Sequence, residues 1–311
     1  SYITEIEPSE CLGQMLRAIK MYNDNCDICS YLTHVVFFCS RNENNSEALI
    51  KHVNRLATTC MKHVRNLSIC KAVVGVICNL SYTAHYIVQL NKTPQCVIMA
   101  LKSHPNDEQL ITAAFSVISN FALSDKGKFF VDAIPILILA LKNRLKIDVT
   151  CKAIIDMAEL VYDYSSAIAE ELINLIKKEK DKITPANCLL SISPNEGAQD
   201  AIFGKLSVFF DMISNNTDED LSTLMLEICS NLKDYQKLKS FEQFVPKLIA
   251  MAKEAKGKLA LPAANCCLNL AIHRPEIILQ FVDTFSLISE TSKGEVGRIC
   301  ALIKEELNNS K

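Results

Sequence analysis

Four residues near the start of the chain have the spacing of metal ligands, Cys26-x2-Cys29-x4-His34-x4-Cys39. Thiolate and imidazole ligands at this spacing are typical of a zinc knuckle, which binds single-stranded nucleic acid. The intervening residues are mostly apolar and include none of the glycines that such a tight loop needs. If the segment is helical, the four side chains point at roughly 0°, 300°, 80° and 220° around the axis and cannot reach one metal. Zinc-dependent nucleic-acid binding is therefore a remote alternative, and we expect no metal or other cofactor.

No other set of residues has the spacing of a catalytic or phosphate-binding site. The sequence contains no Gly-x-Ser-x-Gly elbow, no His-Glu-x-x-His and no glycine-rich phosphate loop. The six histidines are scattered along the chain, and the carboxylates cluster where helix caps explain them. We therefore expect that the protein is not an enzyme.

The composition favours long helices and disfavours a nucleic-acid partner. Only 8 of the 311 residues are Gly and 9 are Pro, which is little punctuation for a turn-rich sheet fold. The formal net charge of −2 leaves no excess of Lys and Arg to neutralise phosphates. The expected partner is therefore a protein or a peptide, with no nucleic acid.

The 14 cysteines lie mostly among aliphatic residues, where a free thiol behaves as a small apolar group. Those predicted to lie in helix cores are Cys60, Cys70, Cys78, Cys151, Cys229, Cys266 and Cys267. Disulfide-dependent secreted domains are much shorter than this chain, so we infer a reducing compartment. Segment 1–5 does not begin a signal peptide, and the most apolar run, 133–141, is half the length of a membrane-spanning helix. We expect a soluble protein without membrane insertion, located in the cytoplasm, with the nucleus as the alternative.

One apolar segment recurs through most of the chain, and an asparagine marks it. The residues at the marked position are Asn79, Asn120, Met157, Ser191, Asn231 and Asn269, separated by 41, 37, 34, 40 and 38 residues. Counted from this position, residues −6, −3, −2 and +1 are apolar or small, which is the spacing of one buried stripe on an α-helix. A period near 40 residues is typical of stacked helical repeats, so we predict an all-α protein.

Two further helices precede each long helix in the predicted repeat. Pro94, Pro135 and Pro246 predict middle helices over 95–102, 136–142 and 247–254, because proline suits the first helical position. Shorter apolar pieces precede them at 86–90, 129–133 and 241–245. Segments 106–108 and 217–220 carry side-chain acceptors that can cap the long helices after them.

Eight such repeats cover the chain as a single domain, with no linker or low-complexity tract that divides it. Because one repeat cannot bury its own stripe, stacked neighbours must form a continuous core. The approximate repeat boundaries are 11–40, 44–83, 84–124, 125–163, 164–194, 195–233, 234–273 and 274–311.

The repeat resembles the armadillo repeat. The residues that carry the resemblance are Ala133-Ile134-Pro135 before a middle helix, and Asn79-Leu80-Ser81 and Asn269-Leu270-Ala271 in long helices. The resemblance covers nearly the whole chain and is strongest over 68–163 and 241–274. It implies a right-handed α-solenoid, an armadillo-like superhelix of about eight repeats, whose third helices line a concave groove.

In the armadillo family, asparagines of the third helices hydrogen-bond the backbone of an extended peptide. The resemblance assigns this role to Asn79, Asn120, Asn231 and Asn269. The other candidate groove residues are Gly75, Ser116 and Asn265, at position −4 and pointing nearly away from the buried stripe, together with Tyr82. The chain departs from the family's import adaptors because it has no Trp and because Met157 and Ser191 interrupt the row of asparagines. An asparagine on a helix flank also has a structural use, as the hydrogen-bond partner of an adjacent repeat.

The leading hypothesis is a non-catalytic scaffold or adaptor that binds a partner protein or an extended peptide along a concave groove. The alternative is a regulator that clamps a folded partner, as co-chaperone nucleotide-exchange factors and small-GTPase regulators of this family do. The interruptions at Met157 and Ser191 favour the alternative. Under the leading hypothesis, Asn79→Ala combined with Asn120→Ala weakens partner capture without lowering thermal stability much.

Overall fold

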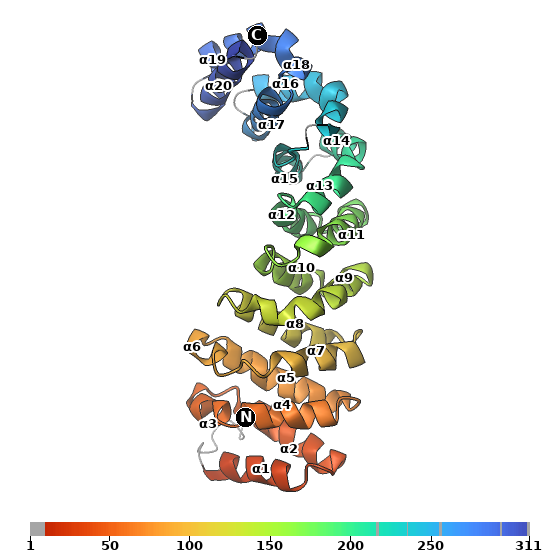
Figure 1. The fold of residues 1–311 in the computed structure, drawn as a ribbon, viewed down its shortest axis with the longest axis vertical. Coiled ribbons are helices and arrows are strands. Elements are labelled where there is room, and N and C mark those ends of the chain that lie inside the picture. The colour runs from red at the N-terminus through yellow and green to blue at the C-terminus, as the bar shows by residue number, and fades with distance from the viewer. Residues whose placement is uncertain (1–9, 216–217, 235, 255–256, 293, 310–311) are drawn as a thin grey trace. The chain divides into compact units, whose positions relative to one another are not determined.

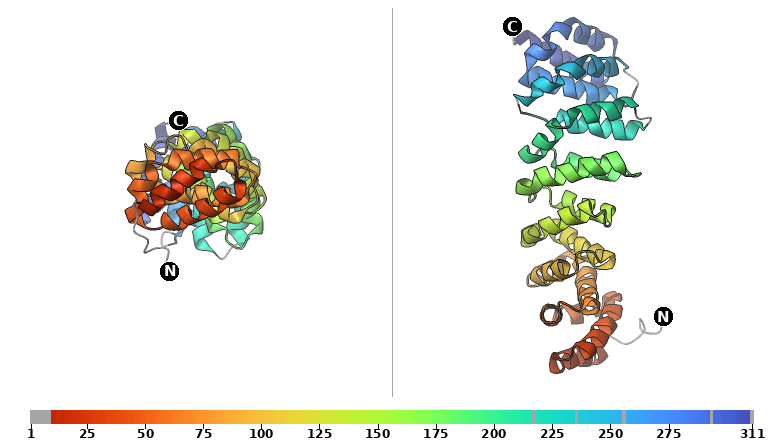
Figure 2. Two further views of the ribbon diagram at one scale, coloured as in Figure 1. Left: turned by 90° about the horizontal axis from the view of Figure 1, so that it is seen from below. Right: turned by 90° about the vertical axis from the view of Figure 1, so that its right-hand side faces the viewer.

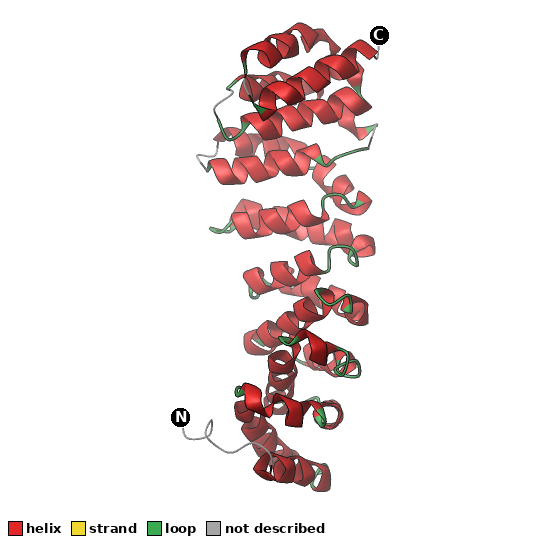
Figure 3. Ribbon diagram, turned by 90° about the vertical axis from the view of Figure 1, so that its left-hand side faces the viewer, coloured by secondary structure: helices red, strands yellow, loops and turns green. Residues whose placement is uncertain are grey.

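The fold is described by a computed structural model for residues 10–215, 218–234, 236–254, 257–292 and 294–309. These residues form α-helices, short 3-10 helices and connecting turns, with no strand among them (Figure 3). The prediction of an all-α protein is therefore confirmed for the described chain. No helix in this part of the chain is both long enough and apolar enough to cross a membrane.

The chain divides into two compact units, Ser1–Val161 (unit 1) and Tyr162–Lys311 (unit 2). The helices of unit 1 are α1 (Glu10–Met21), α2 (Cys26–Cys39), η2 (Glu43–Asn45), α3 (Ser46–Ile50), α4 (Val53–Lys62), α5 (Leu67–Ser81), α6 (Ala84–Ile87), α7 (Pro94–Ser103), α8 (Glu108–Ala122), η3 (Gly127–Ala133), α9 (Ile134–Lys142) and α10 (Ile147–Asp156). Those of unit 2 are η4 (Tyr162–Tyr164), α11 (Ser165–Lys178), α12 (Ile183–Ile192), α13 (Glu196–Phe203), α14 (Leu206–Asn215), α15 (Glu219–Ser230), η5 (Lys237–Phe244), α16 (Val245–Lys253), α17 (Ala260–His273), α18 (Pro275–Ile278), η6 (Leu279–Phe281), α19 (Val282–Thr291) and α20 (Glu295–Asn309).

Within each unit the long helices pack one against the next in chain order. In unit 1, α2 packs on α5, α5 on α8, and α8 on α10, while α4 packs on α7 and α7 on η3 in a second row. The two rows of unit 1 can be followed in Figure 1 and in the right-hand view of Figure 2. In unit 2, α12, α15, α17 and α20 pack in the same order. Each inner helix of these rows (α5, α8, α15 and α17) therefore packs against a long helix on either side.

The predicted stripes form the core of these contacts. All four predicted stripe residues are buried in α5 (Val73, Val76, Ile77 and Leu80), in α8 (Ala114, Val117, Ile118 and Phe121) and in α17 (Ala263, Cys266, Cys267 and Leu270). A fully buried Val, Leu, Ile or Phe side chain contributes about 1.5–3 kcal/mol. The seven cysteines predicted in helix cores are also buried, and all are free thiols.

The predicted helix starts are confirmed where the structure describes them. Each of the three prolines lies in the first turn of its middle helix, in α7, α9 and α16. Asp107 caps α8, because its side chain accepts a hydrogen bond from the Leu110 N–H at 2.8 Å. Asp218 caps α15 in the same way, although Thr217 of that predicted cap lies outside the described residues.

Two local predictions differ from the structure. The short pieces at 129–133 and 241–244 belong to 3-10 helices, η3 and η5, rather than to α-helices, and Val245 already begins α16. The predicted long helix marked by Met157 is cut short, because α10 ends at Asp156 and Met157 is its C-cap. The chain turns there so that Leu160 packs on Gly127 of η3, where a Cβ would lie only 2.8 Å from the Leu160 Cδ1. Tertiary packing therefore overrides the apolar helical pattern at this point.

Candidate functional site

Unit 1 carries a groove of about 690 Å³ between α2, α5 and α8. Its lining consists of two residues of α2, five of α5 with the C-cap Tyr82, five of α8, and Lys146 just before α10. Four of the predicted site residues lie together here: Gly75, Asn79, Tyr82 and Ser116. We call this surface the α5 groove.

The wall of the α5 groove depends on a close approach between Gly75 and Phe37. Gly75 is buried, because the aromatic ring of Phe37, one repeat earlier, lies directly over it. A Cβ on Gly75 would lie 2.5 Å from the Phe37 Cε2, which is closer than atoms can approach without a shift. Position −4 does face away from the stripe of its own helix, but at Gly75 the neighbouring repeat covers it. Phe37 was not among the predicted site residues, and only the packing of α2 on α5 reveals it.

The middle of the groove is neutral and weakly polar. Burial raises the pKa of the Cys78 thiol, although the hydroxyls of Tyr82 and Ser116 beside it act in the opposite direction. The proximity of Cys78 and partial burial raise the pKa of the Tyr82 hydroxyl. Both groups are therefore protonated near neutral pH. A buried neutral thiol is a small apolar surface rather than a nucleophile.

The lysines and the carboxylate that line the groove are paired with groups of the protein itself. Lys71 forms an ion pair with Asp107 at 2.8 Å and donates a hydrogen bond to the Gln109 Oε1 at 3.1 Å. Lys146 lies 3.1 Å from the Glu108 carboxylate. The Lys71 pair is half-buried and the Lys146 pair is largely exposed, so water screens the second pair more strongly.

The predicted asparagines donate their side-chain amides to the preceding repeat. Asn79 Nδ2 donates to the Ser40 Oγ at 2.8 Å, and Asn120 Nδ2 donates to the Ser81 Oγ at 2.9 Å. In unit 2, Asn231 Nδ2 donates to the Ser193 Oγ at 2.8 Å. Three of the four predicted groove asparagines thus form the same bond between repeats, to a serine 38 or 39 residues earlier.

The serines determine which way these amides face. Each serine hydroxyl donates its single proton to the carbonyl three residues earlier, at 2.7 Å for Ser40 and 2.8 Å for Ser81 and Ser193. The hydroxyl oxygen can then only accept from the asparagine, so the amide must present its N–H group to the serine. The Oδ1 of each of the three asparagines accepts no hydrogen bond from the described residues, and each of these asparagines is half-buried as a residue.

The residue two positions after the marked one, in the preceding repeat, accounts for both interruptions in the row. Where the marked residue is Met157 or Ser191 instead of Asn, the position corresponding to the serine one repeat earlier holds Ala122 or Glu159. Asn269 is the exception, since Lys233 stands at the serine position and the Asn269 amide donates to the Leu232 carbonyl instead. The serines that accept these bonds can be read from the sequence, as Ser40, Ser81 and Ser193.

The segment with zinc-ligand spacing is helical, as predicted, because α2 spans all of it. Cys29 and Cys39 are buried, Cys26 accepts a hydrogen bond from the Asn66 amide at 3.1 Å, and His34 lines the α5 groove. Within the described ranges no group of three or more His, Cys, Asp or Glu side chains could hold a metal ion. The helix separates the four residues, so its geometry does not support the zinc alternative.

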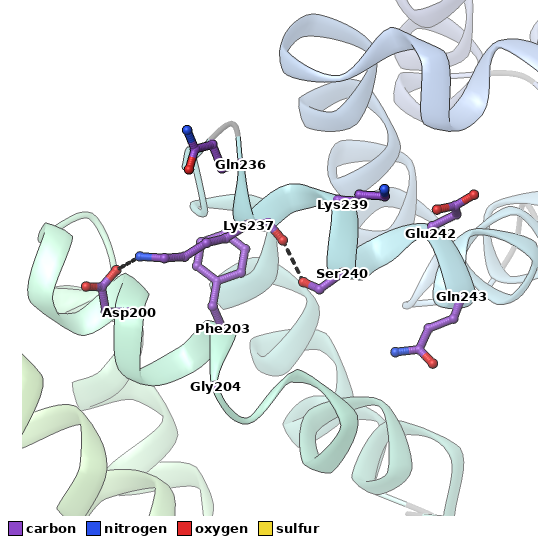
Figure 4. A pocket seen from close by; sticks show the side chains of 9 residues that line it. All are labelled: Asp200, Phe203, Gly204, Gln236, Lys237, Lys239, Ser240, Glu242 and Gln243. Atoms are coloured by element: carbon purple, nitrogen blue, oxygen red, sulfur yellow. Dashed lines mark hydrogen bonds and ion pairs between the residues drawn. The ribbon is translucent and has the colours of Figure 1, made fainter.

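A second concavity, of about 830 Å³, lies in unit 2 between α13 and η5 (Figure 4). Phe203 is its one aromatic side chain. Lys237 is held there by ion pairs with Asp200 and Asp234. None of these residues was predicted, and apart from the single ring the surface is polar, with Lys239, Glu242 and the already paired Lys237. It is therefore a weaker candidate than the α5 groove.

The remaining predicted residues lie outside the α5 groove. Asn120 is on α8, beyond the last residue of that helix that lines it. Asn231 is the C-cap of α15, and Asn265 and Asn269 lie on α17, all in unit 2. None of these four lines the second concavity.

No protein-family model matches the chain, and none of the curated proteins matches it. The α5 groove and the bonds between asparagine and serine are therefore the features from which a function can be proposed.

Proposed function

We propose that this chain is a non-catalytic protein-interaction domain, a scaffold or adaptor, that binds a partner protein through the α5 groove. The observation that carries the proposal is the groove itself, which gathers residues of three successive long helices around a neutral middle. Concave sites with an apolar lining and a few polar groups are the usual location of ligand binding. The thiol and the hydroxyls in the groove are protonated near neutral pH, which suits binding better than nucleophilic chemistry.

The architecture that belongs to this proposal is a right-handed, armadillo-like superhelix of about eight repeats. Its support is the packing of long helices in chain order within each unit. The bonds from asparagine to serine add a second regularity, because they join residues 38 or 39 positions apart in both units. In such a spiral the α5 groove lies on the inner wall, which the third helices of the repeats form.

A second candidate, a regulator that clamps a folded partner, is favoured by the asparagine geometry. An extended peptide gains affinity from main-chain hydrogen bonds with its receptor. Asn79 and Asn120 each commit one of their two amide N–H groups to Ser40 and Ser81, which fixes the orientation of the amide and leaves one N–H and the Oδ1 for a peptide. A folded partner that inserts side chains into the groove does not depend on these amides.

The proposal is tested by filling the groove. Ala113→Arg combined with Ser116→Arg places two long side chains on the α8 wall, at positions that are only half-buried. The matched control is Ser103→Arg combined with Ala250→Arg, at exposed helix positions outside the groove. We expect the proteins captured from a lysate of the source cells, quantified by mass spectrometry, to fall at least tenfold with the groove variant and to be unchanged with the control.

Competition by short peptides separates the two candidate functions. Displacement of the captured partner by extended fragments of its own sequence supports peptide binding, and displacement only by its intact folded domain supports the clamp. Equal capture by the wild type and by the folded groove variant contradicts both.

A further inference from the structure

We infer that the α5 groove takes a short uncharged segment of the partner, anchored by one large apolar side chain such as Leu, Met or Phe. This inference rests on the proposed function and specifies the chemistry of the occupant. Two features of the groove carry it: the pairing of its charges and the nature of its middle.

The lysines and the carboxylate of the lining are already neutralised. Lys71 is held by Asp107 and Gln109, and Lys146 by Glu108. A charged group of the partner must either compete with one of these pairs or enter the groove without a counter-ion, and the cost is larger at the half-buried Lys71 pair than at the exposed Lys146 pair. An uncharged segment leaves the pairs intact. Electrostatic complementarity therefore selects a neutral occupant over a basic or an acidic one.

The middle of the groove suits one apolar side chain. The ring of Phe37, the neutral Cys78 thiol and the exposed ring of Tyr82 lie along one face of α5. The volume of about 690 Å³ is that of a small-molecule pocket rather than of a whole protein interface. A groove of this size accommodates an anchor residue and its immediate neighbours. Such central anchors supply most of the binding energy of an interface.

The contact between Gly75 and Phe37 provides a specific way to alter the groove. A methyl group at Gly75 would lie 2.5 Å from the Phe37 ring, so Gly75→Ala must displace the ring from its place in the groove wall. Phe37→Leu in the same chain removes the ring and relieves the clash. Comparison of Gly75→Ala with the double variant therefore shows whether Gly75→Ala weakens binding by displacing the Phe37 ring or by disrupting α5.

The test uses the full chain and three phage-displayed libraries of 12-residue peptides: uncharged, rich in Lys and Arg, and rich in Asp and Glu. We expect enrichment from the uncharged library, with Leu, Met or Phe recurring at one position. The Kd of a selected peptide should change less than twofold between 50 and 500 mM NaCl. It should rise at least tenfold with Ala113→Arg and with Gly75→Ala, and Phe37→Leu added to Gly75→Ala should bring it back to the Kd of Phe37→Leu alone.

Some results overturn the inference and leave the proposed function standing. These are enrichment only of charged peptides, a selected peptide whose Kd Ala113→Arg does not change, or no enrichment while lysate capture still depends on the groove. If no peptide is enriched and capture is also unaffected by the groove variant, both the inference and the proposed function fail. Ala113→Arg keeps the test decisive if Gly75→Ala does not fold, since Ala113 is only half-buried.

Discussion

The two sides of α8 join their neighbouring repeats in different ways. Toward α5, the Asn120 amide donates to the buried Ser81 hydroxyl at 2.9 Å. Toward α10, the corresponding positions hold Ala122 and the fully buried Met157. The first junction carries a directional polar bond, and the second has apolar side chains at those positions.

The difference shows what the recurring asparagine does in this chain. A buried polar group must find its partner, so a pair such as Asn120 and Ser81 is satisfied only in one register of the two helices. Apolar contacts supply stability without that directionality. Three of the four marked asparagines are bonded to a serine one repeat earlier, so an asparagine at this position does not by itself indicate a peptide ladder.

The largest effect is expected from placing a polar group in the apolar junction. Met157→Asn removes a buried side chain and leaves an amide without its serine, which should lower the free energy of unfolding by about 3 kcal/mol or more. Adding Ala122→Ser should restore about 1 kcal/mol by supplying the acceptor. Urea denaturation of the two variants measures the difference. No recovery with the serine would show that the early end of α10, and not the residue pair, determines this junction.

A smaller effect is expected from removing the polar bond itself. Asn120→Ala should lower the free energy of unfolding by about 1–2 kcal/mol, because it deletes a hydrogen bond beside a buried hydroxyl. This revises the expectation that loss of the groove asparagines leaves thermal stability almost unchanged. A double-mutant cycle with Ser81→Ala should give a coupling near 1 kcal/mol. A coupling of zero would mean that the two side chains do not interact in solution.

The smallest effect concerns the cap of α8 and depends on pH. Burial raises the pKa of Asp107, but hydrogen bonds from Lys71 and from the Leu110 and Gln109 N–H groups outweigh it and hold the pKa below its ordinary value. The ionised carboxylate therefore stabilises the fold at pH values above the unfolded pKa of about 3.9, and this contribution is lost as the pH falls through the lower folded pKa.

Asp107→Asn should consequently destabilise the protein by about 0.5–1 kcal/mol at pH 7 and by nothing measurable once the pH is well below 3.9. Chemical denaturation at the two pH values checks this, with Asp132→Asn on the exposed face of η3 as the matched control. An equal loss at both pH values would assign the effect to packing rather than to charge.

The helical repeat could be predicted from the sequence because its causes are local. The apolar spacing around Val76 and Val117 and the proline at position 94 act within one helix, and the structure has the expected helices there. The early end of α10 depends instead on the packing of Leu160 against Gly127, which no helical pattern contains.

The site was only partly predictable for the same reason. Gly75, Asn79, Tyr82 and Ser116 were found because they recur at equivalent positions on successive long helices. Phe37 was missed, because it enters the groove from the preceding repeat and only the missing side chain at Gly75 lets it do so. The serines were missed as partners because each acts on a helix 38 or 39 residues away.

The central claim is that the asparagines hold neighbouring repeats together while the groove wall holds the partner. The most direct test measures the melting temperature and the partner capture of Asn120→Ala and of Ala113→Arg side by side. We predict that Asn120→Ala lowers the melting temperature and leaves capture intact, whereas Ala113→Arg abolishes capture and leaves the melting temperature unchanged. The reverse outcome, with Asn120→Ala abolishing capture at an unchanged melting temperature, would contradict the account.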